Sequence, residues 1–143
     1  MRSAEKEKPR AHFYLGMMNE YGLAALTQNF TAAAHHYRLA AEKDDPEAMY
    51  HLGLMYAYGR GVIQNFASAM VLFKRSAALQ HAAAQLFLGK MFVHGHGVPI
   101  DYDVALTWFD KASKNAAAAA TPQVADEARR ARDELRQLLD QAH

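Results

Sequence analysis

The chain has 143 residues, of which 51% are hydrophobic, and its formal net charge is +1 with acidic and basic residues interspersed. This length suits one compact domain or one short repeat array, and the hydrophobic content excludes a globally disordered chain. The near-neutral charge predicts neither a nucleic-acid footprint nor attraction to an anionic membrane, and the lack of cysteine excludes disulfides and thiolate chemistry.

Residues 1–10 read MRSAEKEKPR, a charged stretch without an apolar run. Such a stretch is neither a signal peptide nor a membrane anchor. No later segment approaches the length of a transmembrane helix. We therefore expect an N-terminal extension over residues 1–10 and, by default, a cytoplasmic protein without membrane insertion. A chain trimmed at its N-terminus would look the same, so another compartment stays open as an alternative.

Three copies of one pattern follow, over residues 11–45, 46–81 and 82–115. The second and third copies match at a constant spacing of 36 residues, whereas the first half of the first copy precedes the second by 37. The extra residue therefore lies in the turn between Gly22 and Phe30, since turns tolerate length changes. The coinciding pairs are Leu52 and Leu88, Gly53 and Gly89, Met55 and Met91, Gly59 and Gly95, Gly61 and Gly97, and Val62 and Val98.

Each copy predicts a helix, a turn and a second helix. In the second copy, apolar residues recur at the helical spacing i, i+4, i+7 and i+8, at Ala48, Leu52, Met55 and Tyr56. The Gly-x-Gly-Val segment permits positive φ and a tight exit from the first helix. Gly53 and Gly89 lie inside first helices, where glycine costs roughly 1 kcal/mol relative to alanine. We expect these two glycines to allow close contact with alanines of the second helix.

Residues 121–143 predict one more helix, with Thr121 as its N-cap and Pro122 in its first turn. The apolar stripe of this helix alternates spacings of four and three, at Val124, Ala128, Ala131, Leu135, Leu138 and Ala142. We interpret it as a capping helix over the open end of the repeat array. The alternative is a homodimer seam through Val124, Leu135 and Leu138. The alanine run at 116–120 predicts a helix extension or a short linker.

The pattern A-x-x-x-L-G-x-M-[YF]-x-x-G-x-G-V, followed by an alanine and then [WL]-F-x-[KR]-[AS]-[AS], resembles the Sel-one-like repeat, a relative of the tetratricopeptide repeat. The best matches are residues 48–62 with 69–77 and residues 84–98 with 105–112. The first copy departs from the pattern, because Asn19 replaces the aromatic residue and Ala24 replaces the second turn glycine. The resemblance implies an all-α, right-handed superhelical solenoid of antiparallel helix pairs, with about three repeats before the capping helix.

Members of this family act as adaptors and scaffolds, so the resemblance implies a non-enzymatic module that binds another protein or peptide. By analogy with the tetratricopeptide relatives, the first helices line the concave face. The expected partner-binding residues there are Phe13, Met17, Tyr21, Tyr50, Leu54, Tyr58, Leu86, Lys90 and His94. Exposed apolar and aromatic patches are typical of interaction sites. The alternative for each residue is packing against a neighbouring repeat.

The residue types predict no catalytic site, no cofactor and no metal. His94 and His96 share one turn, but zinc requires three or four converging ligands, so a histidine metal site is only an alternative. The serines lack a nucleophile elbow, and the Gly-x-Gly pairs follow helices instead of strands. Two other functions stay open: a structural subunit that self-associates through the C-terminal helix, and an immunity or effector-associated binding protein.

Overall fold

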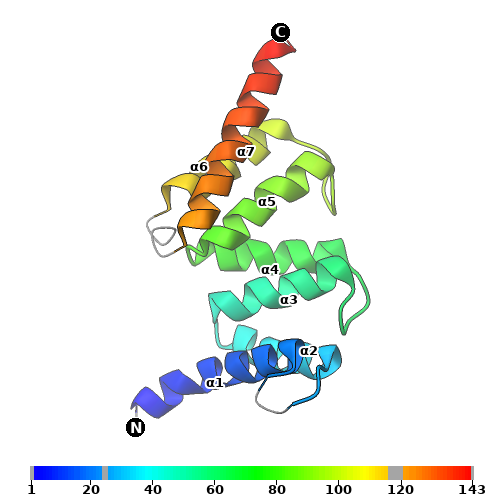
Figure 1. Ribbon diagram of the computed structural model, residues 1–143, viewed down its shortest axis with the longest axis vertical. Coiled ribbons are helices and arrows are strands. Elements are labelled where there is room, and N and C mark those ends of the chain that lie inside the picture. Colours follow the sequence, from blue (N-terminus) through cyan, green and yellow to red (C-terminus); the bar gives the residue numbers. More distant parts are fainter. Residues whose placement is uncertain (1, 24–25, 116–120, 143) are drawn as a thin grey trace. The chain divides into compact units, whose positions relative to one another are not determined.

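The computed structural model describes residues 2–23, 26–115 and 121–142, within which the chain forms helices and no strand (Figure 1). The expected all-α class is confirmed. Ala24 and the alanine run at 116–120 lie outside the described residues. The helices are α1 (Arg2–Tyr21), α2 (Phe30–Glu42), α3 (Pro46–Tyr58), α4 (Phe66–Ala78), α5 (Ala82–His94), α6 (Tyr102–Lys114) and α7 (Pro122–Gln141).

The N-terminal extension predicted over residues 1–10 is helical from Arg2 and is continuous with α1. The chain divides into two compact units, Met1–Ser76 and Ala77–His143. Unit 1 contains α1, α2, α3 and most of α4. Unit 2 contains the end of α4 together with α5, α6 and α7.

In unit 1, α2 packs against both α1 and α3. The start of α3 is fixed by local chemistry, because the side chain of Asp45 accepts the N–H groups of Glu47 and Ala48 while Pro46 occupies the first helical position. The core of unit 1, to which α4 adds Leu72, consists of the buried residues Phe13, Ala33, Ala34, Tyr37, Ala40, Ala41, Ala48, Met49, Leu52, Met55 and Leu72.

Glycines inside the first helices meet aromatic rings of the second helices. A Cβ atom added at Gly16 would lie 2.5 Å from the ring of Tyr37, and one added at Gly53 would lie 2.8 Å from Phe73. In unit 2, a Cβ atom at Gly89 would lie 2.4 Å from Phe109. The prediction of close helix contact at Gly53 and Gly89 is correct, but the prediction of alanine partners is wrong. The flat ring of the second helix fills the space directly over the glycine backbone. An alanine in place of that ring would leave this space empty.

The turns between paired helices follow the predicted geometry. Gly59 ends α3 in the left-handed region at φ 67°, and Gly61 follows at φ 70°. A Cβ atom at Gly61 would lie 2.3 Å from the carbonyl oxygen of Phe30, so the turn packs directly on the start of α2. The first turn, residues 22–29, is one residue longer than the turns at 59–65 and 95–101, as the repeat spacing predicts.

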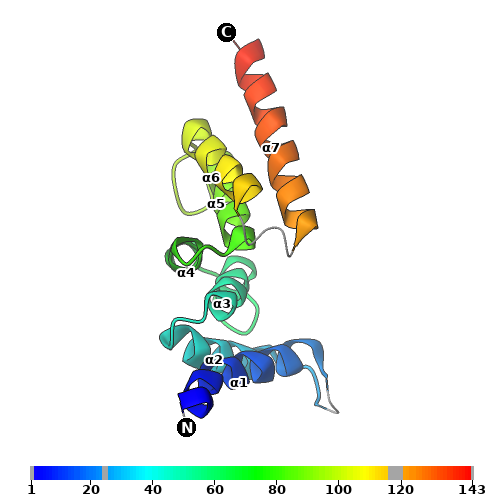
Figure 2. The same ribbon diagram turned by 90° about the vertical axis from the view of Figure 1, so that its left-hand side faces the viewer.

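In unit 2, α7 packs on α6 and also contacts α5 (Figure 2). Leu135 and Ala128 are buried against Leu86 and Phe109. At the edge of this core, the guanidinium of Arg132 lies 3.1 Å from the carboxylate of Asp110. The helix thus covers the face of the third repeat. Thr121 is the N-cap residue, but its side chain makes no capping hydrogen bond.

Helix α7 begins like α3 but ends differently. Both helices begin with a proline, Pro46 or Pro122, but Leu135 stands in α7 at the place where Gly59 ends α3. Lacking that glycine, α7 continues to Gln141 as a helix of 20 residues, whereas α3 has 13. In α7, a helical extension therefore replaces the turn of a repeat.

Candidate partner-binding surface

The predicted partner-binding residues fall into three classes of exposure. Phe13 and Leu86 are buried, with 4% and 5% of their surface exposed. Partial burial is shared by Met17, Tyr50, Leu54 and Lys90, whereas Tyr21, Tyr58 and His94 are exposed. Unit 1 contains Phe13, Met17, Tyr21, Tyr50, Leu54 and Tyr58, and unit 2 contains Leu86, Lys90 and His94.

Phe13 and Leu86 serve the cores of their units. The ring of Phe13 lies 6.0 Å from that of Tyr37 and 5.6 Å from that of His51, measured between centroids. The guanidinium of Arg10 covers it from outside, 4.6 Å from the ring centroid. Leu86 belongs to the unit 2 core. Phe13 and Leu86 therefore pack within the repeat array, as the alternative for each residue stated, because both side chains turn inward between helices.

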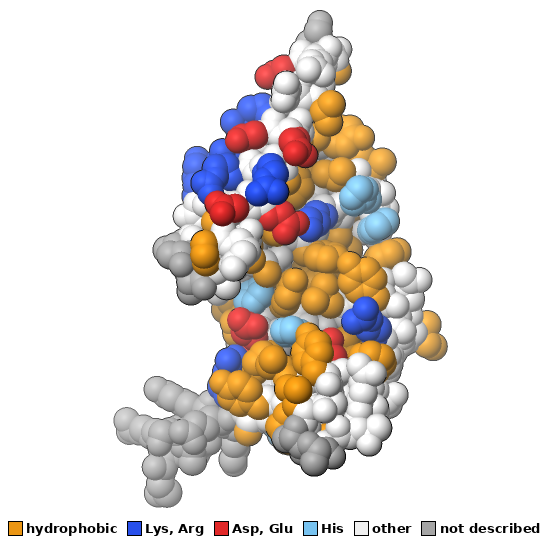
Figure 3. Space-filling model, in the orientation of Figure 1, with side chains coloured by type: hydrophobic (Ala, Val, Ile, Leu, Met, Phe, Trp, Pro, Cys, Tyr) orange, Lys and Arg blue, Asp and Glu red, His pale blue; other side chains and the backbone are white. Residues whose placement is uncertain are grey.

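In unit 1, the remaining residues form what we term the tyrosine face: Met17, Tyr21, Tyr50, Leu54, Tyr58 and Arg60. Figure 3 shows hydrophobic side chains gathered over α1 and α3. The guanidinium of Arg60 lies 5.9 Å from the ring centroid of Tyr58 and 5.8 Å from that of Phe30. These are cation–π distances, which hold the Arg60 side chain between aromatic rings at the edge of the face.

Tyr21 lies in the electrostatic field of this edge. Partial burial raises the pKa of its hydroxyl above the usual value, the nearby carboxyl of Glu20 raises it further, and the charge of Arg60 opposes both effects. Tyr21 is therefore a neutral hydrogen-bonding group on an exposed ring, 52% of which is accessible. A ring with a polar tip of this kind suits a protein interface.

A buried polar group supports the tyrosine face from below. The hydroxyl of Tyr37 donates a hydrogen bond of 2.6 Å to Oε1 of Glu20, which is itself buried. The ring of His51 stacks on Tyr37 with centroids 5.3 Å apart, and its Nδ1 lies 3.7 Å from the same Glu20 oxygen. Burial raises the pKa of Tyr37 far above its usual value, and the hydrogen bond to Glu20 adds to the effect. This group joins α1, α2 and α3 and fixes the positions of the exposed residues on them.

In unit 2, the predicted residues border a groove of about 230 Å³ between α5 and α7. Lys90 forms an ion pair with Glu127 of α7, so its charge is already partnered. The rings of His94 and His96 lie 5.6 Å apart. Of the predicted dimer residues, Val124 and Leu135 pack into the unit 2 core and Leu138 is 62% exposed. The groove is lined by Lys90, Val93, His94, Phe109, Ala131, Glu134, Leu135 and Leu138.

The histidines near α2 pack against one another. Nδ1 of His12 lies 3.4 Å from Nδ1 of His36, and the two rings are stacked. Burial lowers the pKa of His36 below its usual value, and the charges of His12 and His35 lower it further.

Among the described residues, no group of three or more His, Cys, Asp or Glu side chains converges as metal ligands. Across the same residues, no helix has both the length and the apolar character that crossing a membrane requires.

Sequence reasoning missed Tyr14 and Arg60. Tyr14 is 53% exposed and lies seven residues before Tyr21, which places both rings on one side of α1. The i, i+7 spacing of two tyrosines was available as a signal. Arg60 occupies the variable position between two turn glycines, and only the structure shows that it lies between Phe30 and Tyr58.

Solved structures of other proteins share this architecture. A Sel1 repeat protein from Oxalobacter formigenes is 28% identical, with a TM-score of 0.72 over 81% of this chain and 47% of that one. A protective antigen of uropathogenic Escherichia coli strains, which displays an SLR fold, is 34% identical, with a TM-score of 0.72 over 79% of this chain and 24% of that one. The chain therefore spans about half and about a quarter of these two proteins.

A third structure, cysteine rich protein B of Helicobacter pylori, is 22% identical with a TM-score of 0.63, over 80% of this chain and 87% of that one, and it supports the fold alone. The search of curated proteins found no match. A model of the Sel1 repeat matches three consecutive segments, residues 9–45, 46–81 and 82–116, which together cover most of the sequence. The chain therefore belongs to the Sel1 repeat family, as its repeat pattern predicts.

Proposed function

We propose that the chain is a non-enzymatic interaction module that binds a peptide or helix of a partner protein on the tyrosine face. Sel1 repeat proteins generally serve as protein–protein interaction scaffolds. The observation that carries the proposal is the pair of exposed tyrosines, Tyr21 and Tyr58, at equivalent positions near the ends of α1 and α3. They are 52% and 59% exposed although such rings are usually more buried.

The physical basis of binding is the burial of apolar side chains on a surface that is already formed. Tyrosine is enriched among the residues that contribute most to interfaces, because it offers a large rigid area at low entropic cost. Tyr37 and Glu20 hold α1 and α2 together beneath the face, and Arg60 is held by the rings on either side of it. A partner would therefore meet a preorganised surface, which lowers the cost of association.

The experiment compares wild type with the double variant Tyr21→Ala/Tyr58→Ala in affinity capture from lysate of the native host, followed by titration calorimetry with the captured partner. We expect the variant to bind the partner at least roughly tenfold more weakly than wild type. A tenfold loss corresponds to about 1.4 kcal/mol of binding free energy, which interface tyrosines can contribute. Both side chains are exposed, so their removal leaves the core intact. Tyr50 is a poorer target, because its ring lies 5.9 Å from the buried ring of Phe73.

The matched control is Ile63→Ala/Val71→Ala, which removes two exposed apolar side chains of unit 1 that lie outside the first helices. It should bind like wild type. A partner held equally by wild type and by the tyrosine variant would contradict the proposal. Circular dichroism of all three proteins confirms that any loss of binding is not a loss of helix.

A further inference from the structure

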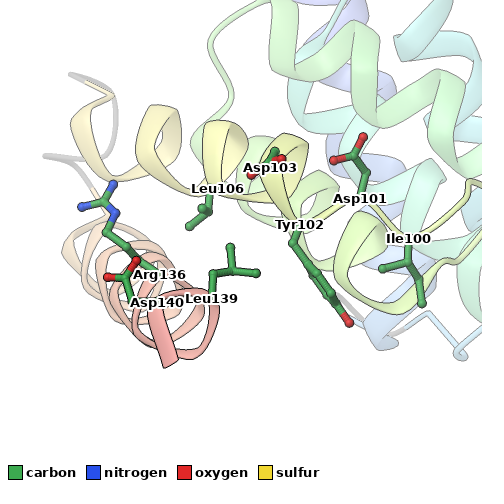
Figure 4. Close-up of a pocket in the computed structure, with 8 residues that line it drawn as sticks. All are labelled: Ile100, Asp101, Tyr102, Asp103, Leu106, Arg136, Leu139 and Asp140. Carbon is green, nitrogen blue, oxygen red and sulfur yellow. The ribbon is translucent and has the colours of Figure 1, made fainter. Parts of the chain in front are cut away.

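Unit 2 contains a cleft of about 520 Å³ between the start of α6 and the last turns of α7. Figure 4 shows Leu106 of α6 and Leu139 of α7 on facing sides of it, with Tyr102 at the start of α6 and Ile100 in the segment before that helix. This cleft lies apart from the residues predicted for partner binding and plays no role in the function proposed above. It is lined by Ile100, Asp101, Tyr102, Asp103, Leu106, Arg136, Leu139 and Asp140.

The repeat pattern explains why the cleft is open. Phe30 and Tyr102 are equivalent, because each is the first residue of a second helix. In unit 1, the next repeat covers Phe30: Gly61 packs on its carbonyl group and the Arg60 guanidinium lies 5.8 Å from its ring centroid. In unit 2, the helical extension of α7 replaces that turn. Tyr102 is therefore left 42% exposed.

The charges in the cleft favour a cation. Asp101, Asp103 and Asp140 oppose a single cation, Arg136. Asp101 caps α6 by accepting the N–H of Val104. Within the part of the chain that the structure describes, the carboxylates of Asp103 and Asp140 have no hydrogen-bond or ion-pair partner. Asp101 and Asp103 also offset the partial positive charge at the start of α6.

We propose that this cleft binds an arginine-bearing peptide segment of another protein. The guanidinium stacks on Tyr102, as Arg60 lies over Phe30 in unit 1. Its charge is attracted by Asp103, which follows Tyr102 in the first turn of α6, and more weakly by Asp140, which lies across the cleft beside Arg136 (Figure 4). Flanking apolar side chains of the peptide contact Ile100, which is 56% exposed. Arginine suits the site better than lysine, because its planar head both stacks on a ring and donates to carboxylates. The Arg60 turn of a second copy is not the occupant, since that turn already covers Phe30.

The test titrates the full ¹⁵N-labelled chain with a blocked eight-residue peptide that has the sequence of residues 57–64, AYGRGVIQ. Two further peptides carry glutamine or glutamate in place of the arginine. We expect chemical-shift changes at the amides of residues 100–106 and 136–140. The glutamine peptide should bind roughly tenfold more weakly, the effect of losing a cation–π contact and a nearby charge pair. Added salt should weaken the arginine peptide most.

The variant Asp103→Asn/Asp140→Asn should reduce the affinity for the arginine peptide to that of the glutamine peptide. Its matched control, Glu42→Gln/Asp126→Asn, removes two exposed carboxylates outside the cleft and should bind like wild type. Thermal melting checks that both variants fold. The proposal is overturned if the arginine and glutamine peptides bind equally, if the glutamate peptide binds best, if the shifts map to the tyrosine face, or if no peptide binds at millimolar concentration.

Discussion

The cores of the two units bury polar groups of different kinds at the centre of similar helix pairs. Unit 1 buries an ionisable carboxyl, Glu20, bonded to the hydroxyl of Tyr37. Unit 2 buries a neutral amide, Gln85, which donates to the carbonyl of Ala77 and accepts from Asn115. Both groups have hydrogen-bond partners inside their own unit. The repeat framework thus tolerates polar groups wherever local partners complete their hydrogen bonds.

Equivalent positions explain the difference. Tyr37 is equivalent to Phe73 of the second repeat, and Glu20 is equivalent to Ala57. The two positions change together: the repeat with the tyrosine has a glutamate, and the repeat with the phenylalanine has an alanine. A buried hydroxyl without an acceptor costs free energy, so the tyrosine of the first repeat requires Glu20. The comparison teaches that an aromatic ring over the glycine is constant among the repeats, whereas the group at the outer edge of the ring, a hydroxyl or a hydrogen, can vary.

The largest effect is expected in the apolar core of unit 2. Leu135→Ala should lower the free energy of unfolding by about 3 kcal/mol, because it empties a buried site that α7 shares with Leu86 and Phe109. Denaturation in urea, followed by circular dichroism, measures this loss. The control is Leu138→Ala, which removes a leucine from the exposed side of the same helix and should change stability by less than about 0.5 kcal/mol.

The same pair of variants tests the predicted dimer seam. If α7 acts only within its own chain, wild type and Leu138→Ala sediment as monomers. A dimer in wild type that Leu138→Ala dissociates would instead support self-association through the C-terminal helix. Equal stability of the two leucine variants would contradict the packing of Leu135 in the core.

A smaller effect is expected for the polar core of unit 1. Glu20→Ala should lower the free energy of unfolding by about 2 kcal/mol, because it leaves the buried hydroxyl of Tyr37 without its acceptor. Tyr37→Phe alone should cost a similar amount by removing the donor from Glu20. The double variant Glu20→Ala/Tyr37→Phe reproduces the pair found in the second repeat and should cost less than the two single changes added together. A purely additive double variant would show that the two side chains do not interact.

The smallest effect is a pH dependence of unit 1 through His36. The folded chain lowers the pKa of His36 below its usual 6.5, so between pH 6.5 and the folded value the unfolded chain binds more protons. His36 therefore stabilises the fold fully above pH 6.5 relative to lower pH, and this contribution declines as the pH falls. The melting temperatures of wild type and His36→Gln, measured at several pH values from 7.5 to 5.0, should converge or cross as the pH falls. A constant difference between the two melting temperatures would contradict the lowered pKa of His36.

Much of the fold could be predicted from the sequence, because glycines and apolar spacings repeat at a fixed interval. The register of the helix pairs, the glycine turns and the extra residue in the first turn all follow from that interval. The family follows from the same residues. These features depend on local backbone preferences, which a repeated motif records directly.

The exposed surface was harder to predict. Spacing alone could not show that Phe13 and Leu86 turn inward while Tyr14 stays exposed, because a helix packed on two sides buries more than one face. Nor could it show that Arg60 lies over Phe30, or that the continuation of α7 leaves Tyr102 uncovered. These outcomes depend on contacts between residues far apart in sequence, and the mutual approach of two helices decides them.

The contact between a glycine and an aromatic ring also limits how the repeat can evolve. At Gly16, Gly53 and Gly89, even alanine, the smallest replacement, would place its methyl carbon 2.4 to 2.8 Å from the facing ring. No conservative substitution therefore exists at these three sites, and every missense change there adds bulk. By contrast, the outer edge of the ring has already exchanged tyrosine for phenylalanine among the repeats of this chain. Substitutions should therefore be tolerated at residues that face the outer edge of the rings and be removed by selection at the glycines beneath the rings.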